Sequence, residues 1–331
     1  METTYMIGID IGGTKCAVVL GACTPEGDLT ILEKKRFPTG HRPWQEVLEQ
    51  FYIETESVLA THGLTSVQVG AIGISCGGPL DSKRGVIMSP PNLPGWDNVP
   101  IVELFEKRFG IPTGIQNDAN ACALAEWKFG TGRGADNVVF LTFGTGMGAG
   151  LILDGRLYSG TNDMAGEVGH MAMRPFGPVG YGKAGSFEGF CSGGGIAQLA
   201  KTRALERLQM GEHTAYCPDA SALESITAQS VAEAAAAGDP DAREVYRISG
   251  QLLGEGLSLL IDILNPEVIV IGSIFARAHD LLWPTAAETI RREALSHAQN
   301  VCRVVPAGLG EQIGDYAALS VAVYTASQLR S

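Results

Sequence analysis

A strand, a glycine-rich turn and a returning strand occur twice in this chain, and this repetition limits its fold more than any other feature. The first copy, DIGGTKCAVVL, begins at Asp10 and follows an alternating apolar run at residues 6–9. The second copy, TFGTGMGAGLIL, begins at Thr142 and follows another apolar run. Coincidence is the alternative explanation for the second copy. We interpret the pair as an internal duplication, which predicts an α/β protein with two similar halves.

The turn of the first copy has the chemistry of a phosphate-binding loop. Gly12 and Gly13 leave backbone N–H groups uncovered, and the hydroxyl of Thr14 is a further donor. Asp10 is suited to hold a hydrated Mg²⁺, which usually binds one or two carboxylates together with substrate phosphates. With Lys15, these residues form the candidate nucleotide-binding set, and an ordinary hairpin with a solvated aspartate is the alternative. The chain has no G-x-x-x-x-G-K-S/T motif and no G-x-G-x-x-G that follows a strand and opens a βαβ unit. A P-loop and a dinucleotide fold are therefore not predicted.

Length and charge narrow the class of protein. The 331 residues predict two domains, and 45% hydrophobic with 18% charged residues is enough apolar content for sizeable cores. A net charge of -12 argues against nucleic acid or an anionic membrane as the main partner. The seven cysteines include no C-x-x-C pair, which favours free thiols and a cytoplasmic location. The start of the sequence lacks a basic segment and is not a signal peptide, and no apolar tract predicts a membrane span.

Strand and helix patterns alternate along the rest of the chain, without a low-complexity tract. After the first hairpin, a third strand at residues 29–37 predicts an antiparallel meander. Later strands are predicted at 67–75, 113–116, 137–143, 149–153, 267–271 and 301–305. Helices are predicted to begin near residues 43, 100 and 118 and to span about 196–208, 228–237, 240–264, 290–297 and 315–329.

Four short motifs carry a family resemblance that covers nearly the whole chain. They are DIGGTK from Asp10, NDAN from Asn117, LTFGTG from Leu141 and GEVGH from Gly166. In this order and spacing they resemble the ROK family of bacterial sugar kinases, open reading frames and repressors. Each motif is weak alone, and the specificity comes from their order.

The resemblance implies the actin/Hsp70/hexokinase-type, ribonuclease H-like fold. Two duplicated α/β domains, each with a five-stranded mixed sheet, would then face a deep cleft, with one phosphate hairpin on each wall. We expect residues 1–117 plus 315–331 to form the first domain, to which the closing helix returns, and residues 118–314 to form the second. The resemblance also implies a homodimer.

Asp118 is the candidate catalytic base. Transfer of a γ-phosphoryl group needs a proton acceptor for the attacking hydroxyl, and an aspartate at a helix start can reach one. From the residues alone, Asn117 or Asp118 could merely cap the helix. By resemblance, Asp118 matches the family's base and Asn117 its sugar-binding neighbour.

Glu167, His170 and Glu188 form the candidate sugar-binding cluster. Carboxylates accept paired hydrogen bonds from vicinal hydroxyls, and the imidazole can donate one more. Two solvated glutamates and a backbone-bonded histidine are the alternative. By resemblance, Gly78 and Asn92 add sugar contacts, although loops such as SPPNLPGW also favour asparagine for turn chemistry.

The second hairpin supplies the remaining nucleotide candidates. By resemblance, Thr142, Gly144, Thr145 and Gly146 face the β- and γ-phosphates. Two further glycines are expected near the adenosine, namely Gly194 and Gly272.

One departure from the family pattern concerns zinc. Most members carry C-x-C-G-x-x-G-C-x-E between the His and the Glu, and they bind a structural Zn²⁺ there. Val179, Tyr181 and Ser186 stand here in place of the three cysteines. Because structural zinc sites need about four ligands, mostly thiolates, we expect no zinc site. We expect Tyr181 and Phe187 to pack into the space instead.

These observations predict an ATP- and Mg²⁺-dependent kinase that phosphorylates a hexose at the 6-hydroxyl, with glucokinase-like activity. An N-acetylhexosamine kinase or fructokinase of the same family is the same-class alternative. The different-class alternative is a catalytically silent sugar-binding regulator. ROK repressors carry an N-terminal winged helix-turn-helix, whereas strand pattern begins here near Tyr5, so we expect that module to be absent.

Overall fold

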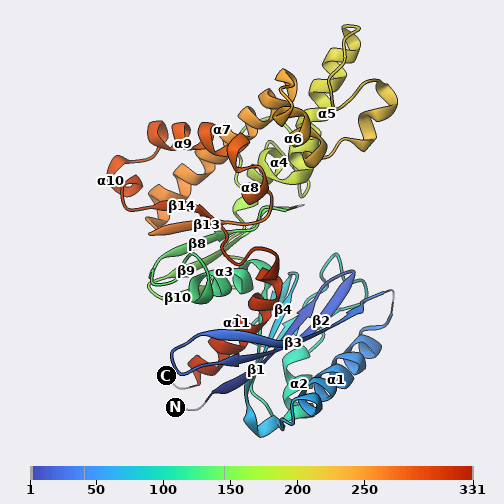
Figure 1. Cartoon of the computed structure of the whole chain (residues 1–331), viewed down its shortest axis with the longest axis vertical. Helices are drawn as coiled ribbons and strands as arrows, with labels where there is room; N and C mark the ends of the chain where they lie inside the picture. Colours follow the sequence, from blue (N-terminus) through green and yellow to red (C-terminus); the bar gives the residue numbers. More distant parts are fainter. Residues whose placement is uncertain (1–2, 41, 145, 330–331) are drawn as a thin grey trace. The chain divides into compact units, whose positions relative to one another are not determined.

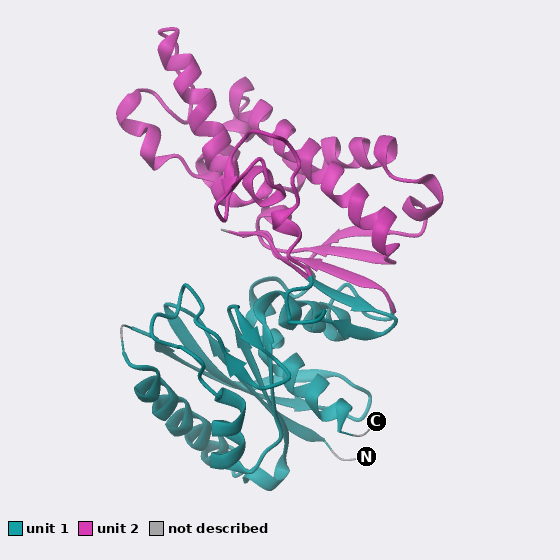
Figure 2. Cartoon of the chain, turned by 180° about the vertical axis from the view of Figure 1, so that it is seen from behind, with its two compact units in different colours: residues 1–135, 150–165, 308–331 teal, residues 136–149, 166–307 magenta. Residues whose placement is uncertain are grey.

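The computed structural model describes residues 3–40, 42–144 and 146–329. The chain forms two compact units (Figure 2). Unit 1 contains residues 1–135, 150–165 and 308–331, and unit 2 contains residues 136–149 and 166–307. Throughout the described part of the chain, every helix is too short or too polar to cross a lipid bilayer.

The first five-stranded sheet has the order β3-β2-β1-β4-β7 (Figure 1). Its strands are β1 (Thr4–Ile11), β2 (Lys15–Cys23), β3 (Leu29–Pro38), β4 (Val69–Cys76) and β7 (Thr113–Asn117). The first three pair antiparallel, which confirms the predicted meander, whereas β4 and β7 run parallel to β1. β1 continues one residue beyond Asp10, where the sequence pattern placed its end.

Alternating residues of this sheet bury its two faces in different cores. On one face, Ile7 and Ile9 pack in a cluster with Phe51 of α1 (Trp44–Thr61) and Phe105 of α2 (Ile101–Phe109). On the other face, the sheet packs against the closing helix α11 (Ile313–Gln328), which contributes Leu319 and Ala322. This period-two alternation explains why β1 and β4 are nearly continuous apolar runs, since both faces are covered.

Glycine allows α11 to approach the sheet. A Cβ atom on Gly73 of β4 would lie 2.1 Å from the backbone nitrogen of Ala322 in α11, so only glycine fits there. Helix α3 (Asp118–Phe129) also packs on α11, and it therefore belongs to unit 1. The sequence division placed α3 after a boundary at residue 117, and that division stays a prediction.

The second five-stranded sheet has the order β10-β9-β8-β13-β14. Its strands are β8 (Val138–Leu141), β9 (Ala149–Leu153), β10 (Arg156–Tyr158), β13 (Val268–Ile271) and β14 (Arg303–Pro306). In both sheets the chain-order sequence is third, second, first, fourth and fifth, and the fourth strand is parallel to the first and the fifth. The two sheets therefore repeat one topology, as the repeated hairpin predicted.

The remaining elements are short strands and helices. The small strands are β5 (Leu80–Asp81), β6 (Val86–Ile87), β11 (Val179–Gly180) and β12 (Lys183–Ala184). The 3₁₀ helices are η1 (Ser66–Gln68), η2 (Val168–His170), η3 (Ala220–Ser225) and η4 (Gly310–Gln312). The helices of unit 2 are α4 (Phe187–Cys191), α5 (Gly193–Gln209), α6 (Ala228–Ala236), α7 (Pro240–Leu264), α8 (Ile274–Arg277), α9 (His279–Glu293) and α10 (Ser296–Gln299).

Two of the predicted helices begin earlier in the structure than expected, and the short helices α4, α8 and α10 were not predicted. Helix α9 begins at His279 rather than near residue 290 and has Pro284 inside it, and the segment predicted at 290–297 crosses the break between α9 and α10. Helix α5 begins at Gly193 rather than near residue 196. The side chain of Ser192 caps it by accepting a hydrogen bond from the Gly195 N–H at 3.1 Å.

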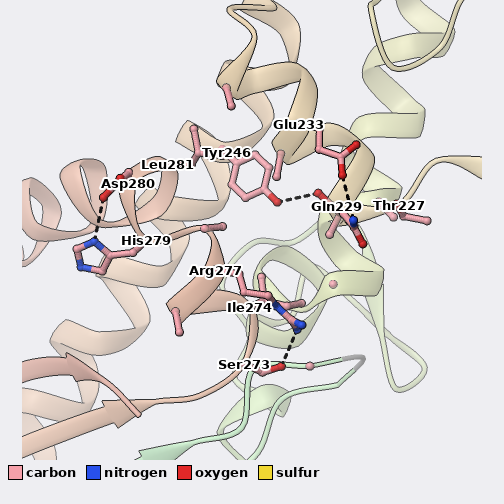
Figure 3. A pocket seen from close by; sticks show the side chains of 18 of the residues that line it. Thr227, Gln229, Glu233, Tyr246, Ser273, Ile274, Arg277, His279, Asp280 and Leu281 are labelled. Atoms are coloured by element: carbon pink, nitrogen blue, oxygen red, sulfur yellow. Dashed lines mark hydrogen bonds and ion pairs between the residues drawn. The ribbon is translucent and has the colours of Figure 1, made fainter. Parts of the chain in front are cut away.

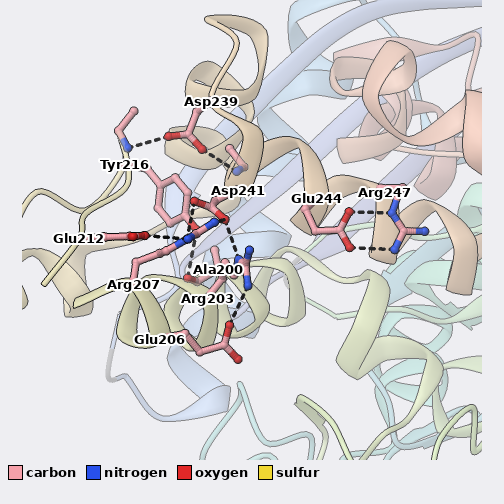
Figure 4. Close-up of polar contacts among 12 residues, drawn as sticks. Ala200, Arg203, Glu206, Arg207, Glu212, Tyr216, Asp239, Asp241, Glu244 and Arg247 are labelled. Atoms are coloured by element: carbon pink, nitrogen blue, oxygen red, sulfur yellow. Dashed lines mark hydrogen bonds and ion pairs between the residues drawn. The ribbon is translucent and has the colours of Figure 1, made fainter. Parts of the chain in front are cut away.

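A cluster of ion pairs links α5 to the first turn of α7 (Figure 4). Asp241, in that first turn, accepts hydrogen bonds from Arg203 at 2.7 Å and from Arg207 at 3.0 Å. Although burial raises the pKa of Asp241, the bonds from Arg207 and Arg203 outweigh it and lower that pKa on balance. The cluster secures α5, whose first turn lines the pocket of unit 2 described below.

Candidate active site

The register of the first sheet brings three strand ends to one edge. Ile11 of β1 pairs with Cys76 of β4, and Cys76 pairs with Asn117 of β7. Because the three strands are parallel, the residues that follow them leave the sheet side by side. The glycine turn after β1, the Gly77–Gly78 segment after β4 and Asp118 after β7 therefore meet at this edge, where ligands of open α/β sheets usually bind.

The first hairpin is tight and packs against the proline-rich loop. The N–H of Gly12 donates to the carbonyl of Lys15 at 3.2 Å, and a Cβ atom on Gly12 would lie 2.6 Å from that oxygen. A Cβ atom on Gly13 would lie 2.5 Å from the carbonyl oxygen of Asn92. Both positions therefore require glycine. The side chains of Thr14 and Lys15 are exposed and accessible to a ligand.

Asn92 lies close to two of the other candidates. A Cβ atom on Gly77 would be 3.2 Å from the Asn92 amide nitrogen, so the asparagine side chain borders the turn that contains Gly78. Its backbone contacts Gly13 of the hairpin. The structure thus groups Asn92, Gly78 and the hairpin at the same edge, and the asparagine side chain is exposed.

Asn117, not Asp118, caps helix α3. The Asn117 side-chain oxygen accepts a hydrogen bond from the Asn120 N–H at 2.8 Å. Asp118 is the first residue of the helix, and its side chain is exposed. The cap interaction that competed with a catalytic role therefore belongs to its neighbour, which leaves the Asp118 carboxylate available.

The pKa values of two carboxylates at this edge are raised. Burial, and secondarily repulsion from Asp118, raise the pKa of Asp10 to about 6, against the smaller opposing influence of Lys34. Protein atoms close to the Asp118 carboxyl restrict its hydration and raise its pKa as well. A divalent cation beside Asp10 would relieve this unfavourable charge, so the donor set fits a Mg²⁺ that is carried with substrate phosphates.

The second hairpin, between β8 and β9, has its own closing interactions. The Thr142 N–H donates to the Gly148 carbonyl at 2.9 Å, and the Thr142 hydroxyl accepts from the Gly148 N–H at 2.8 Å. The Gly144 N–H donates to the Gly146 carbonyl at 3.1 Å, and a Cβ atom on Gly144 would meet open space. Thr145, a predicted phosphate ligand, lies outside the described residues.

The candidate sugar-binding side chains of unit 2 lie against this hairpin. Glu188, in α4, accepts a hydrogen bond from the Met147 N–H at 2.9 Å, so one carboxylate oxygen is already engaged. A Cβ atom on Gly169 would lie 2.3 Å from the Met147 carbonyl and 3.2 Å from the Cβ of Glu188. The loop that carries Glu167 and His170, both exposed, is therefore packed beside Glu188.

The segment that contains Val179 and Tyr181, where most family members have zinc-binding cysteines, forms a small hairpin of strands β11 and β12. Val179 exchanges two hydrogen bonds of 2.9 Å with the side-chain amide of Gln198, and the Lys183 ammonium donates to the His170 carbonyl at 2.5 Å. Tyr181 is 75% exposed and its ring makes an edge contact with the His170 ring, so the expectation that it packs into the space of the zinc site is wrong. Tyr181 lies in the turn between β11 and β12, where its backbone has φ 43°. Within residues 3–40, 42–144 and 146–329, no cluster of three or more potential metal ligands occurs.

Phe187 behaves differently from Tyr181. It is fully buried, and a Cβ atom on Gly256 of α7 would lie 2.4 Å from its ring. The glycine thus creates the space that this ring fills. Phe187 fixes α4, and with it Glu188, against the long helix.

A large cavity of about 1230 Å³ lies beside the second hairpin, entirely within unit 2 (Figure 3). Gly144 and Gly194 line it, as does Ser273, the residue after Gly272. Its walls come from the start of α5, from α6, from α8 and from the start of α9. This volume exceeds the roughly 300–1,000 Å³ usual for small-molecule pockets and is large enough for a nucleoside with phosphates.

Polar groups around this cavity were not identified from the sequence. Arg277 donates to the Ser273 hydroxyl at 3.0 Å, and Gln229 donates to Glu233 at 3.0 Å (Figure 3). Tyr246 lines the cavity and donates its hydroxyl hydrogen to the Ala228 carbonyl at 2.9 Å. These residues come from distant helices with ordinary helical spacing, so only the tertiary fold reveals that they share a site.

Comparison with known proteins agrees with this architecture. The fold is that of the two-domain, actin-like ATPases. The family model described as "ROK family" matches residues 6–323, and the chain belongs to the ROK family. It is 32% identical over 310 residues to a glucokinase of Streptomyces coelicolor, covering 93% of this chain and 94% of that protein.

Two other relatives show the range of the family. A solved ROK glucokinase of Streptomyces griseus, in complex with glucose and AMPPNP, is 29% identical with a TM-score of 0.70. The match covers 98% of this chain and 100% of that one. The DNA-binding transcriptional repressor Mlc of Escherichia coli is 30% identical over 256 residues, or 77% of this chain and 59% of the repressor. The chain is thus related to glucokinases and also to a DNA-binding transcriptional repressor.

Proposed function

We propose that this protein is an ATP-dependent hexose kinase that phosphorylates the 6-hydroxyl, with glucokinase-like activity. The observation that supports the proposal most is that the Asp118 carboxylate is free of the helix-cap interaction, which Asn117 makes instead. This carboxylate is accessible at the same sheet edge as Asp10 and the glycine hairpin. The glucokinase relative and the glucose complex of a ROK glucokinase support a hexose as the acceptor.

In the proposed reaction, Asp118 accepts the proton of the sugar hydroxyl as its oxygen attacks the γ-phosphorus. The bond from that phosphorus to the β,γ-bridging oxygen breaks, and ADP leaves. Asn117 and Asn92 would hold the sugar in position, as would Glu167, His170 and Glu188. Backbone N–H groups of both glycine hairpins would bind the phosphates.

The nucleotide would use the cavity of unit 2. Gly194 and the Gly272–Ser273 turn would lie near the adenosine, with Gly144 and Gly146 near the phosphates. Asp10 is the residue that would hold Mg²⁺, which supplies charge neutralisation on the phosphates. The AMPPNP bound by the Streptomyces griseus relative supports ATP as the donor.

The competing proposal is a catalytically silent sugar-binding regulator. The match to the Mlc repressor supports this alternative. One experiment separates the two. The purified protein is incubated with ATP, Mg²⁺ and a panel of glucose, mannose, fructose, allose and the N-acetyl hexosamines, and ADP release is followed. We expect turnover with glucose. Turnover only with an N-acetyl sugar or fructose would reassign the substrate, and no ADP release with any sugar of the panel would support the regulator.

A further inference from the structure

Thr39, which follows β3, contacts the first glycine hairpin and was not recognised as important from the sequence. The β2–β3 register pairs Lys15 with Pro38, and this places Thr39 beside the turn. Thr39 is only 3% exposed. Its backbone N–H donates to the Thr14 carbonyl at 3.0 Å.

The side chain of Thr39 makes the closest contact. Its hydroxyl donates to the Gly12 carbonyl at 2.5 Å, and the Cys16 sulfur lies 3.2 Å from the same hydroxyl oxygen. The Cys16 thiol also donates to the Gly12 carbonyl, at the longer distance of 4.0 Å. One buried residue therefore holds both ends of the turn, Gly12 by its side chain and Thr14 by its backbone.

The absence of side chains makes a glycine turn suitable for binding a phosphate and also leaves its backbone flexible. Without side chains, the turn can lie against a phosphate, but it has little packing of its own to keep its N–H groups in one orientation. A hydrogen bond from outside the turn limits that freedom before a ligand arrives. Preorganised donors bind an anion better than donors that must first be ordered.

We propose that Thr39 is a positioning residue that preorganises the hairpin of residues 12–15 for the phosphates of the nucleotide. The proposal rests on the kinase function proposed above. The Thr39 hydroxyl alone would account for this preorganisation in the variants below, because the hydrogen bond from the Thr39 backbone N–H to Thr14 does not depend on the side chain.

The test compares four variants with the wild-type chain. Thr39→Val replaces the hydroxyl with a methyl group of similar size, Thr39→Ala removes it without crowding, and Thr39→Ser restores it. Thr55→Val is the matched control, because Thr55 is also buried in unit 1 and its hydroxyl has no hydrogen-bond partner among the described residues.

Four quantities are measured: the KM for ATP, the KM for the hexose, the Kd for ADP with Mg²⁺ by calorimetry, and amide exchange in peptides covering residues 12–16. We expect Thr39→Val and Thr39→Ala to raise the KM for ATP and the Kd for ADP roughly five- to tenfold, the effect of about one hydrogen bond. Exchange in the hairpin should accelerate, and the hexose KM should stay within about twofold. Thr39→Ser and Thr55→Val should resemble the wild type.

The proposal is overturned if Thr39→Val and Thr39→Ala retain wild-type ADP affinity and exchange, if Thr39→Ser fails to restore them, or if hexose and nucleotide affinity fall together. A wild-type protein that phosphorylates no hexose would overturn the proposed function alone. In that case the ADP-binding and exchange measurements still decide the role of Thr39, since neither needs turnover.

Discussion

The carboxylate of Glu126 in α3 accepts a hydrogen bond of 3.0 Å from the backbone N–H of Leu309, 183 positions further along the chain. The same carboxylate accepts from the N–H groups of Gly308 at 3.2 Å and Thr131 at 2.9 Å, and from the Thr131 hydroxyl at 3.1 Å. Glu126 is fully buried, and all four donors are neutral. It joins the segment that follows α3 to the segment that returns to unit 1 at Gly308, and it thereby fixes the helix that begins with Asp118.

Glu126→Gln should therefore destabilise the protein. A glutamine has one acceptor oxygen and one NH₂ group, so the NH₂ group would face a backbone N–H donor. We expect a loss of about 1–3 kcal/mol in the free energy of unfolding, measured by urea denaturation. Glu56→Gln, at an exposed ion pair with Arg108, is the control and should change stability by less than about 1 kcal/mol. Equal effects of the two substitutions would show that the Glu126 bonds contribute little.

Asp118→Asn tests the proposed base. An amide cannot accept the proton of the sugar hydroxyl, so kcat should fall by roughly 10²–10⁴-fold. The melting temperature should hardly change, because the helix cap is made by Asn117. Asn117→Ala is the contrasting variant, since it removes the cap and should cost about 1 kcal/mol of stability. A fully active and equally stable Asp118→Asn protein would remove Asp118 from the mechanism.

Asp10→Asn tests the raised pKa. An unfolded aspartate titrates near 4, whereas folded Asp10 titrates at about 6. The folded state therefore binds more protons between these values, and the stability contribution of Asp10 is fully present below about pH 4 and is lost as the pH rises through about 6. Removing the charge should stabilise the nucleotide-free protein at pH 7 by about 1–3 kcal/mol and flatten the pH dependence between 4 and 6.

The same variant should weaken catalysis. Loss of the carboxylate should raise the Mg²⁺ concentration needed for half-maximal activity and leave sugar binding intact. Thermal melts across pH and activity across Mg²⁺ concentration measure both effects, with the exposed Asp28→Asn as control. An unchanged Mg²⁺ requirement would argue against Asp10 as the metal-holding residue.

The substituted cysteines predict that the protein holds no stoichiometric zinc. A structural site needs about four ligands, and Val179, Tyr181 and Ser186 occupy the thiolate positions. We expect elemental analysis to find far less than one zinc per chain, and a chelator to leave the melting temperature unchanged, because no metal contributes to folding. About one zinc per chain would contradict this prediction.

Local patterns in the sequence were sufficient for much of the fold. Alternating apolar residues and glycine turns predicted both hairpins, the meander and the duplication, since each depends on neighbours within about ten residues. The Asn117-Asp118 pair was recognised as a helix start for the same reason. The sequence did not decide which of the two makes the cap, because that depends on the side-chain conformation that the surrounding edge allows.

Other features depend on residues that are far apart in the chain. The helix predicted at residues 290–297 starts too late and runs past the observed end of α9 at Glu293. Pro284 lies inside α9, where burial of Leu282, Ala286 and Ile290 holds the helix together across it. Tyr181 was expected to pack into the space of the zinc site, but its side chain lies exposed on the β11–β12 turn. The Ile11–Cys76–Asn117 register, the cavity of unit 2 and the Thr39 contact with Gly12 arise only when strands and helices pair across long separations. The amino-acid sequence therefore determined the local units and their chemistry, whereas the tertiary structure decided which groups meet, because long-range pairing leaves no periodic signal along the chain.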